Sequence, residues 1–182
     1  MGKSIMKTNK IDSQLLENLL KKTAEGDKKS FHKLYKILKG PIYGYSLSIL
    51  KNHDDALDNM QDVFIKVYDS LENYKYQNKP MNWIFTITKN CALMKIRKEK
   101  KEQKQEIEKE QIINSSISEE DKIMLKILME VLSDEERQIM IMHLVGNLKH
   151  KEIAKILDLK LSTTLSKYHR ALKKLRLQWK EV

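Results

Sequence analysis

A run of cationic and hydroxyl side chains close to the C-terminus has the chemistry of a nucleic-acid contact. Arg and Lys can bond guanine edges and phosphates, and Ser and Thr can bond bases or phosphates. An ordinary solvated helix face usually mixes its charges, whereas residues 159–179 contain no Asp or Glu. The candidate DNA-contacting residues of this run are Ser162, Thr163, Ser166, Lys167, Arg170, Lys173 and Lys174.

A helix must present these side chains, and the apolar spacing predicts one over residues 162–179, capped by Ser162 or Thr163. A shorter helix is predicted over 149–157, and residues 158–160 make a tight connection between the two. This arrangement is typical of a helix-turn-helix. The stripe expected to be buried is Leu161, Leu165, Tyr168, Leu172 and Leu175.

Composition sets the expected fold class. Gly and Pro number only 5 and 2, whereas helix-forming residues abound, so the sequence predicts an all-α protein. No run approaches the roughly 18 apolar residues that a membrane span needs, and the first residues lack a secretory apolar core. With a single cysteine as well, we expect a cytoplasmic protein without membrane insertion.

Charge is distributed unevenly along the chain, whose formal net charge is +10. Residues 1–103 carry 20 Lys and Arg against 12 Asp and Glu, residues 104–122 carry 3 against 6, and residues 123–182 carry 12 against 7. Two basic blocks around an acidic spacer suit two nucleic-acid contacts joined by a linker. We therefore predict two small helical domains, 1–103 and 119–182, joined by a flexible linker over 104–118.

Apolar residues spaced three and four apart predict the helices of the first domain. Two helices are expected between residues 12 and 38, the second capped near Asp27 or Ser30 and ended by Gly40-Pro41. A third should run over 42–51, and a fourth should be capped by an aspartate at position 54 or 55. The fourth helix is expected to bury Met60, Phe64, Val67 and Leu71.

A loop is expected over residues 73–80, because this polar stretch ends in a proline. A long helix should start at Asn82 and continue beyond Met94 out of the core into water, because the apolar positions thin out there. Its core-facing residues are expected to be Ile84, Ile87, Cys91 and Met94. The second domain is predicted to contain helices over 119–132, 134–145, 149–157 and 162–179.

Together the two halves resemble sigma factors of the sigma-70 family, specifically the extracytoplasmic-function (ECF) group that retains only regions 2 and 4. Residues 54–68, with the pattern Asp-x-x-Gln-Asp-x-Phe, are similar to region 2.2, and residues 74–101 are similar to regions 2.3 and 2.4. Residues 132–137 resemble the start of region 4.1, and residues 150–157 and 166–171 resemble region 4.2. The order and separation of these motifs carry the resemblance.

The resemblance implies a sigma factor that binds core RNA polymerase and directs it to specific promoters. The expected partners are the beta-prime clamp helices and the beta flap of the polymerase, promoter DNA, and an anti-sigma factor. In the holoenzyme the protein would be associated with the nucleoid. Region 4 would read the minus-35 element through the C-terminal residues named above. Region 2.2 would bind the polymerase through Asp58, Gln61, Asp62 and Lys66.

Members of the family capture a flipped base near the minus-10 element, and stacking surfaces and cations must offset the cost of unstacking it. Here the resemblance assigns aromatic faces to Tyr74, Tyr76 and Trp83, and a base-reading amide to Asn90. Trp83 could equally pack in the core. The cations expected at the minus-10 DNA are Lys75, Lys79, Lys89, Lys95, Arg97 and Lys98.

The chain departs from the family pattern in three places. Residues 158–160 stand where many relatives have Gly-Val-Pro, and Leu165 stands where a lysine contact is common. Residues 79–82 replace a frequent Ser-Phe-x-Thr before Trp83. The resemblance therefore does not extend to the base preferences at the two promoter elements.

Two other functions fit parts of the sequence. A helix-turn-helix regulator would bind duplex DNA without polymerase but leaves residues 74–90 unexplained, and an adaptor would bind polymerase without DNA. An enzyme is not expected, because His143 and His150 lack a paired acid and Cys91 lies on an apolar face. No catalytic residue, metal or cofactor is predicted, since there is also no glycine-rich phosphate loop.

Overall fold

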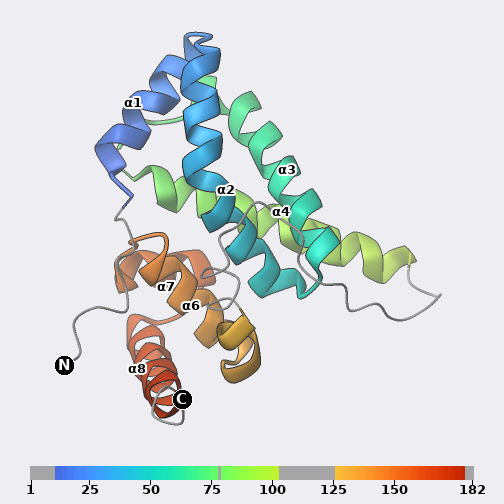
Figure 1. Ribbon diagram of the computed structural model, residues 1–182, viewed down its shortest axis with the longest axis vertical. Coiled ribbons are helices and arrows are strands. Elements are labelled where there is room, and N and C mark those ends of the chain that lie inside the picture. The colour runs from blue at the N-terminus through green and yellow to red at the C-terminus, as the bar shows by residue number, and fades with distance from the viewer. Residues whose placement is uncertain (1–10, 78, 103–125, 179–182) are drawn as a thin grey trace.

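The computed structural model describes residues 11–77, 79–102 and 126–178, with only the backbone for 99–102 (Figure 1). Within these ranges all regular structure is helical, which confirms the all-α prediction. No helix among them is long and apolar enough to cross a membrane. The predicted linker over 104–118 and the start of the predicted helix 119–132 lie outside the described residues.

The first two helices are α1 (Ser13–Ala24) and α2 (Lys28–Leu50). The Asp27 carboxylate accepts a hydrogen bond from the Lys29 N–H at 2.9 Å, so the predicted cap of the second helix is confirmed. Gly26 joins the helices with a φ of 89°, a left-handed conformation that costs glycine little.

Pro41 lies inside α2, so the prediction that Gly40-Pro41 ends one helix and Ile42 begins another is wrong. Proline removes one backbone donor from the helix. Residues 41–48 are all buried, however, and burial of so much apolar surface outweighs one lost hydrogen bond. The helix ends instead at Lys51, whose φ is 61°.

Helix α3 (His53–Asp69) is capped by Asn52, which accepts from the Asp55 N–H at 3.0 Å, rather than by either predicted aspartate. The buried Asn59 donates to the Ser46 hydroxyl at 2.8 Å and so ties α3 to α2. All four residues of the predicted stripe are buried: Met60, Phe64, Val67 and Leu71.

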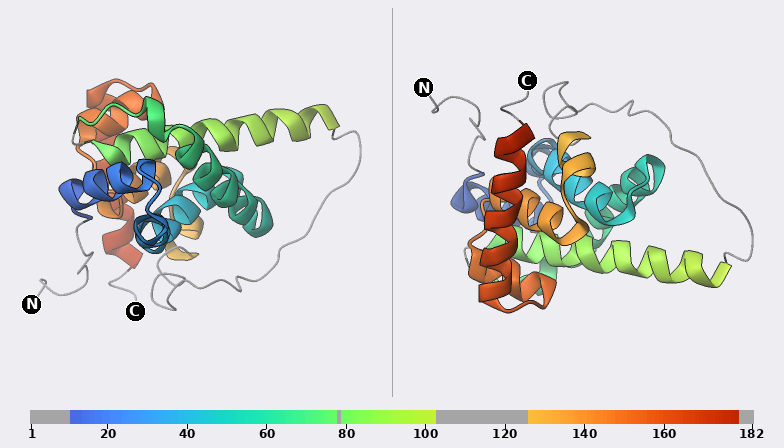
Figure 2. Two further views of the ribbon diagram at one scale, coloured as in Figure 1. Left: turned by 90° about the horizontal axis from the view of Figure 1, so that it is seen from above. Right: turned by 90° about the horizontal axis from the view of Figure 1, so that it is seen from below.

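A short 3-10 helix (Leu71–Asn73) and a loop lead to α4 (Pro80–Glu102), which begins two residues earlier than predicted. Proline is well suited to the first turn of a helix, where its missing N–H has no partner to lose. The Met94 side chain is 57% exposed, so its predicted core position is wrong. Figure 2 shows the reason: the C-terminal part of α4 projects beyond the other helices, as predicted.

The C-terminal unit contains a helical stretch over 126–131, α6 (Asp134–Leu144), α7 (His150–Leu157) and α8 (Leu161–Gln178). The buried Arg137 caps the first stretch, because its guanidinium donates to the carbonyls of Leu128, Met129 and Leu132. Asp158, with a φ of 57°, ends α7 and begins the turn to α8. The predicted helix-turn-helix is therefore present.

Helix α8 begins at Leu161, so neither Ser162 nor Thr163 stands at its cap position. Leu161 is exposed and therefore not part of the buried stripe. The fully buried positions are Thr164, Ala171 and Leu175, with Leu165, Tyr168 and Leu172 half-buried beside them. The Thr164 hydroxyl donates to the Lys160 carbonyl at 3.2 Å, which satisfies this buried polar group.

The two helical units pack against each other. Helix α2 contacts α6, the N-terminal half of α4 lies beside α7, and buried residues of both units join in one core (Figures 1 and 2). Gly146, between α6 and α7, is required for this approach, because a Cβ there would collide with the Phe85 ring and the Met142 carbonyl. The unit that carries the helix-turn-helix therefore lies against the start of α4.

Candidate nucleic-acid interface

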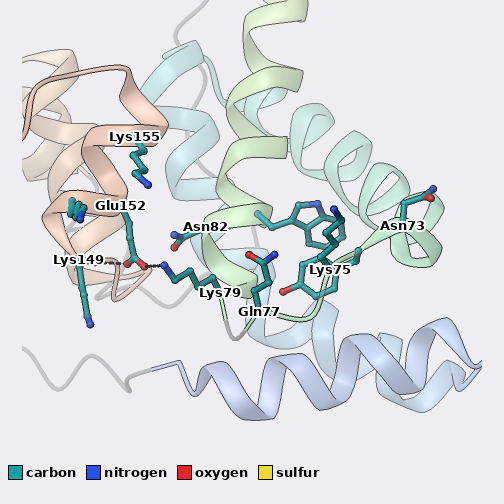
Figure 3. A pocket seen from close by; sticks show the side chains of 11 residues that line it. Asn73, Lys75, Gln77, Lys79, Asn82, Lys149, Glu152 and Lys155 are labelled. Atoms are coloured by element: carbon teal, nitrogen blue, oxygen red, sulfur yellow. Dashed lines mark hydrogen bonds and ion pairs between the residues drawn. The ribbon is translucent and has the colours of Figure 1, made fainter.

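A cleft of about 770 Å³ separates the loop before α4 from helix α7 (Figure 3). Lysines from both units line it, with Glu152 as its one carboxylate among the described residues. Such an excess of cations favours a polyanionic ligand. The lining residues are Asn73, Tyr74, Lys75, Gln77, Lys79, Asn82, Trp83, Lys149, Lys151, Glu152 and Lys155.

Two aromatic residues, Tyr74 and Trp83, line this cleft, and the ring of Tyr76 packs beside Tyr74. The Tyr74 ring lies 4.4 Å from Trp83 and 5.0 Å from Tyr76, centroid to centroid. Its hydroxyl donates to Glu17 of α1 at 2.7 Å, and burial together with Glu17 raises the pKa of Tyr74. Tyr74 is buried, Trp83 half-buried and Tyr76 exposed, so Trp83 both packs against the core and borders the cleft.

Two lysines of the predicted minus-10 set contact α7 across the boundary between the units. Lys79 Nζ lies 3.4 Å from Glu152 Oε1, as Figure 3 shows, and Lys89 Nζ donates to the Ile156 carbonyl at 2.5 Å. Burial by itself would raise the pKa of Glu152. The Lys149 N–H, the Asn82 side chain and Lys79 together hold that pKa below its ordinary value, so Glu152 carries a negative charge at neutral pH.

The other predicted minus-10 residues do not share one surface. Lys75, Asn90, Arg97 and Lys98 are exposed, and Lys75 alone of these four lines the cleft. Lys95 lies instead on the side of α4 that faces α3, where its Nζ is 2.9 Å from Asp55 and 3.4 Å from Asp58. The structure thus brings Tyr74, Lys75, Tyr76, Lys79, Trp83 and Lys89 to one end of α4 and places Lys95 elsewhere.

A second depression, of about 760 Å³, runs between α3 and α4. All four residues predicted to bind the polymerase are exposed along it: Asp58, Gln61, Asp62 and Lys66. Six other residues line it as well: Ile65, Asp69, Cys91, Met94, Lys95 and Lys98. Ile65 and Met94, which are 60% and 57% exposed, were missed by sequence reasoning, and Lys95 and Lys98 had been assigned to the minus-10 DNA. The available signal for Ile65 was an apolar residue within the polar face of a helix. The groove combines apolar and charged groups, as protein-binding surfaces do.

The outward face of α8 carries the predicted minus-35 residues. Ser162, Ser166, Arg170 and Lys173 are exposed, and Thr163, Lys167 and Lys174 are half-buried. We expected a face without acidic residues. Helix α8 itself has none on this face, but α6 places two carboxylates against its cations. Lys167 lies 2.6 Å from Glu135, Lys174 lies 2.6 Å from Glu136, and Arg170 lies 3.9 Å from Glu136.

Glu136 is a buried carboxylate at the first turn of α6. Burial alone would raise its pKa, but hydrogen bonds from Lys174 and from the Ser133 N–H at 3.1 Å hold the pKa below its ordinary value. This residue therefore links the start of α6 to helix α8 through fixed charge-assisted hydrogen bonds.

Comparison with known protein families gives matches to both halves of the chain. The family model for sigma-70 region 2 matches residues 34–102, and that for sigma-70 region 4 matches residues 124–175. The ECF RNA polymerase sigma factor SigW of Bacillus subtilis is 24% identical over 92% of this chain and 98% of its own length. The RNA polymerase sigma factor SigV of the same organism is 29% identical over 77% of this chain and 85% of its own.

Solved structures of sigma factors share the fold. RpoE, crystallised with the anti-sigma factor NepR from Bartonella quintana, has a TM-score of 0.64 and 23% identity over 84% of this chain and 98% of its own. CnrH, in complex with the cytosolic domain of CnrY, has a TM-score of 0.61 and 17% identity over 92% of this chain and 98% of its own. With matching models for both regions, in the predicted order, the chain belongs to the sigma-70 family of RNA polymerase sigma factors, in the ECF group.

Proposed function

We propose that this chain binds core RNA polymerase and directs it to specific promoters. One observation carries the proposal: a single chain combines an exposed α3–α4 groove of mixed polar and apolar character with a helix-turn-helix whose second helix points cations outward. Sigma-70 factors are transcription initiation factors and not enzymes, which agrees with the absence of predicted catalytic residues.

The α3–α4 groove would be the main polymerase-binding surface. Large exposed apolar side chains gathered at one place, such as Ile65 and Met94, commonly mark a protein contact. Asp58, Gln61 and Asp62 on the same surface would give that contact its polar specificity and face the beta-prime clamp helices. The C-terminal unit would reach the beta flap, which is a proposal from the family resemblance alone.

The N-terminal half of α4, together with the loop before it, and helix α8 would contact the promoter. Tyr76, Trp83 and Asn90 would hold an unstacked minus-10 base, with Lys75, Lys79 and Lys89 near the phosphates. Helix α8 would enter the major groove at the minus-35 element and present Ser166, Arg170 and Lys173. In the holoenzyme the protein would then be held on the nucleoid.

The decisive experiment is reconstitution with core polymerase, followed by sequencing of transcripts started from genomic DNA. We expect a defined set of new start sites that core enzyme alone does not use. Tight duplex binding without polymerase, and no start-site selection with it, would favour the regulator alternative. Binding to polymerase without any start-site selection would favour the adaptor.

Asn90→Ala separates the two activities within region 2, because Asn90 is exposed on α4 and not in the α3–α4 groove. We expect impaired promoter opening, read by permanganate reactivity of unpaired thymines, with holoenzyme assembly intact. Thr86→Ala, one turn earlier on the same helix and also exposed, is the matched control. Loss of assembly in the Asn90 variant would remove the base-capture role.

An anti-sigma factor is a further proposed partner. Both structural relatives were solved as complexes, CnrH with CnrY and RpoE with the anti-sigma factor NepR. This chain has the same fold and exposes the apolar side chains of Ile65 and Met94, which a regulatory protein could cover to prevent polymerase binding.

A further inference from the structure

A buried carboxylate of α1 holds the aromatic wall of the cleft, formed by Tyr74 and Trp83, from behind. Glu17 belongs to the buried face of α1 and is only 8% exposed. Its Oε1 accepts a hydrogen bond from the Tyr74 hydroxyl at 2.7 Å, across 57 residues of sequence. The Tyr74 ring packs on Trp83, with the centroids 4.4 Å apart. Glu17 does not itself line the cleft, so its influence there passes through Tyr74.

Packing of α1 alone does not explain this carboxylate. A buried carboxylate needs hydrogen-bond partners to offset the loss of water. In the part of the chain that the structure describes, Oε2 of Glu17 has no partner, so the Tyr74 hydroxyl alone bonds this side chain. A leucine would fill a similar volume without any polar atom to satisfy, and would dock α1 at a lower cost in desolvation.

The carboxylate has a clear effect on the orientation of the Tyr74 ring. A hydrogen bond to a carboxylate is shorter and stronger than one to a neutral oxygen, so it holds the phenol more firmly in one orientation. The Tyr74 ring contacts both Trp83 and Tyr76, and its orientation therefore determines how all three rings lie. A stacking surface that is ordered before its ligand arrives loses less conformational entropy on binding.

The elements around Glu17 are those that shape the loop before α4. Helix α1 contacts both the 3-10 helix (Leu71–Asn73) and α4, which lie on either side of this loop. The bond from Glu17 reaches Tyr74, the first residue of the loop. Burial and this hydrogen bond raise the pKa of Tyr74 above its ordinary value, so the phenol keeps its proton and donates it to Glu17 at neutral pH.

We propose that Glu17 is a positioning residue for capture of the minus-10 base. It fixes Tyr74, and through Tyr74 the Trp83 ring, in the arrangement that an unstacked base binds. Helix α1, to which no DNA contact is assigned, thereby takes part in promoter opening. This inference rests on the proposed function, because it adds a residue to the same minus-10 surface.

The test is a double-mutant cycle between Glu17→Leu and Tyr74→Phe in reconstituted holoenzyme, on a promoter that the wild-type holoenzyme selects. Each single change leaves the other polar group buried without its partner and should lower the free energy of unfolding. The double change removes both groups and should restore most of that stability. Urea unfolding measures stability, and the rate at which thymines become reactive to permanganate measures opening.

We expect Glu17→Leu to slow opening by about two- to tenfold, the range that the cost of ordering one side chain allows, with holoenzyme assembly intact. The double variant should open promoters as slowly, although its stability recovers, because the anchor of the ring is still missing. Glu17→Gln, whose amide oxygen can accept from Tyr74, should lie between Glu17→Leu and wild type. Opening at the wild-type rate in the double variant would show that the bond is purely structural and would overturn the proposal.

Tyr43→Phe is the matched control, because it removes another hydrogen-bonded phenol from the same unit. The Tyr43 hydroxyl lies 2.9 Å from His53 Nδ1, between α2 and α3 and outside the cleft. This change should leave the rate of opening as it is in wild type. If Tyr43→Phe slowed opening as much as Glu17→Leu does, any weakening of the unit would have that effect, and the positioning role would be wrong.

These outcomes are separable from failure of the proposed function. If wild type selects start sites while the double variant opens promoters at the wild-type rate, the positioning role alone is wrong. If wild type neither joins core polymerase nor selects start sites, the proposed function is wrong and the positioning role falls with it.

Discussion

Two carboxylates hold the cations of the two proposed DNA-contacting surfaces, and they do so from different places. Glu136 belongs to the same unit as its partners Lys174 and Arg170, and its side chain is only 2% exposed. Glu152 reaches Lys79 from the other unit and is 19% exposed. We interpret the first as a group that positions its cations permanently and the second as a contact across the boundary between the units that solvent can reach.

The comparison shows that a short distance between opposite charges can mark either a permanent contact or an exchangeable one in this protein. A buried carboxylate within one unit keeps its partners whenever the unit is folded, because breaking the contact leaves a buried charge unpaired. A partly exposed carboxylate across a boundary can be exchanged for water or phosphate at little cost. The predictions below test this contrast, from the largest expected effect to the smallest.

Glu136→Ala should lower the free energy of unfolding by about 3 kcal/mol, because it removes both a buried ion pair and the acceptor for the Ser133 N–H. Urea unfolding followed by circular dichroism measures this. Glu135→Ala is the control, because Glu135 is exposed, and it should cost less than about 1 kcal/mol. If both variants lost the same free energy of unfolding, Glu136 would contribute no more than an exposed surface ion pair does.

Arg170→Ala should weaken minus-35 recognition by about 1–3 kcal/mol if the guanidinium reads a base. Its side chain is 61% exposed and 3.9 Å from Glu136, so stability should change little. Holoenzyme affinity for wild-type and base-substituted promoters provides the measurement. Lys173→Ala, expected to lose a phosphate contact, should weaken all sequences alike. An unchanged footprint in the Arg170 variant would refute its assignment.

Low pH should remove the contribution of Glu136 to the free energy of unfolding. Its pKa is held below the ordinary value of 4.5, so the stabilisation is fully present above that pH and is lost as the pH falls through the lowered pKa. The difference in unfolding free energy between wild type and Glu136→Gln should therefore stay constant from neutral pH to about 5 and shrink below 4.5. A difference that did not change with pH would show that the charge is not responsible.

The smallest expected difference is in how salt weakens the contacts of Glu152 and of Glu136. Raising ionic strength should weaken the exposed Lys79–Glu152 contact, by well under about 1 kcal/mol, and leave the buried Glu136 contacts almost unchanged. A carbodiimide joins a carboxylate to an amine in direct contact, so coupling of Lys79 to Glu152 along a salt series, detected by mass spectrometry of peptides, reports the first. Unfolding of Glu136→Gln against wild type over the same series reports the second. Parallel responses would mean that both contacts are equally accessible to solvent.

Local chemistry made part of the fold predictable. The Asp27 cap, the buried stripe of α3 and the turn at residues 158–160 all follow from side chains acting on neighbours a few residues away. The exposed polar residues of α3 and α8 were predictable for the same reason. Pro41 shows the limit: its local effect is to end a helix, but burial of residues 41–48 overrides it.

The sequence by itself determined that the chain is helical, that its motifs follow the order of sigma regions 2 and 4, and which side of most helices is polar. Only the tertiary structure decided that Met94 is exposed, that α6 places acids against the cations of α8, and that Glu152 faces Lys79. Helical periodicity records how apolar residues are arranged around one helix. It contains no information about which distant helix packs there, because such contacts join residues far apart in the chain.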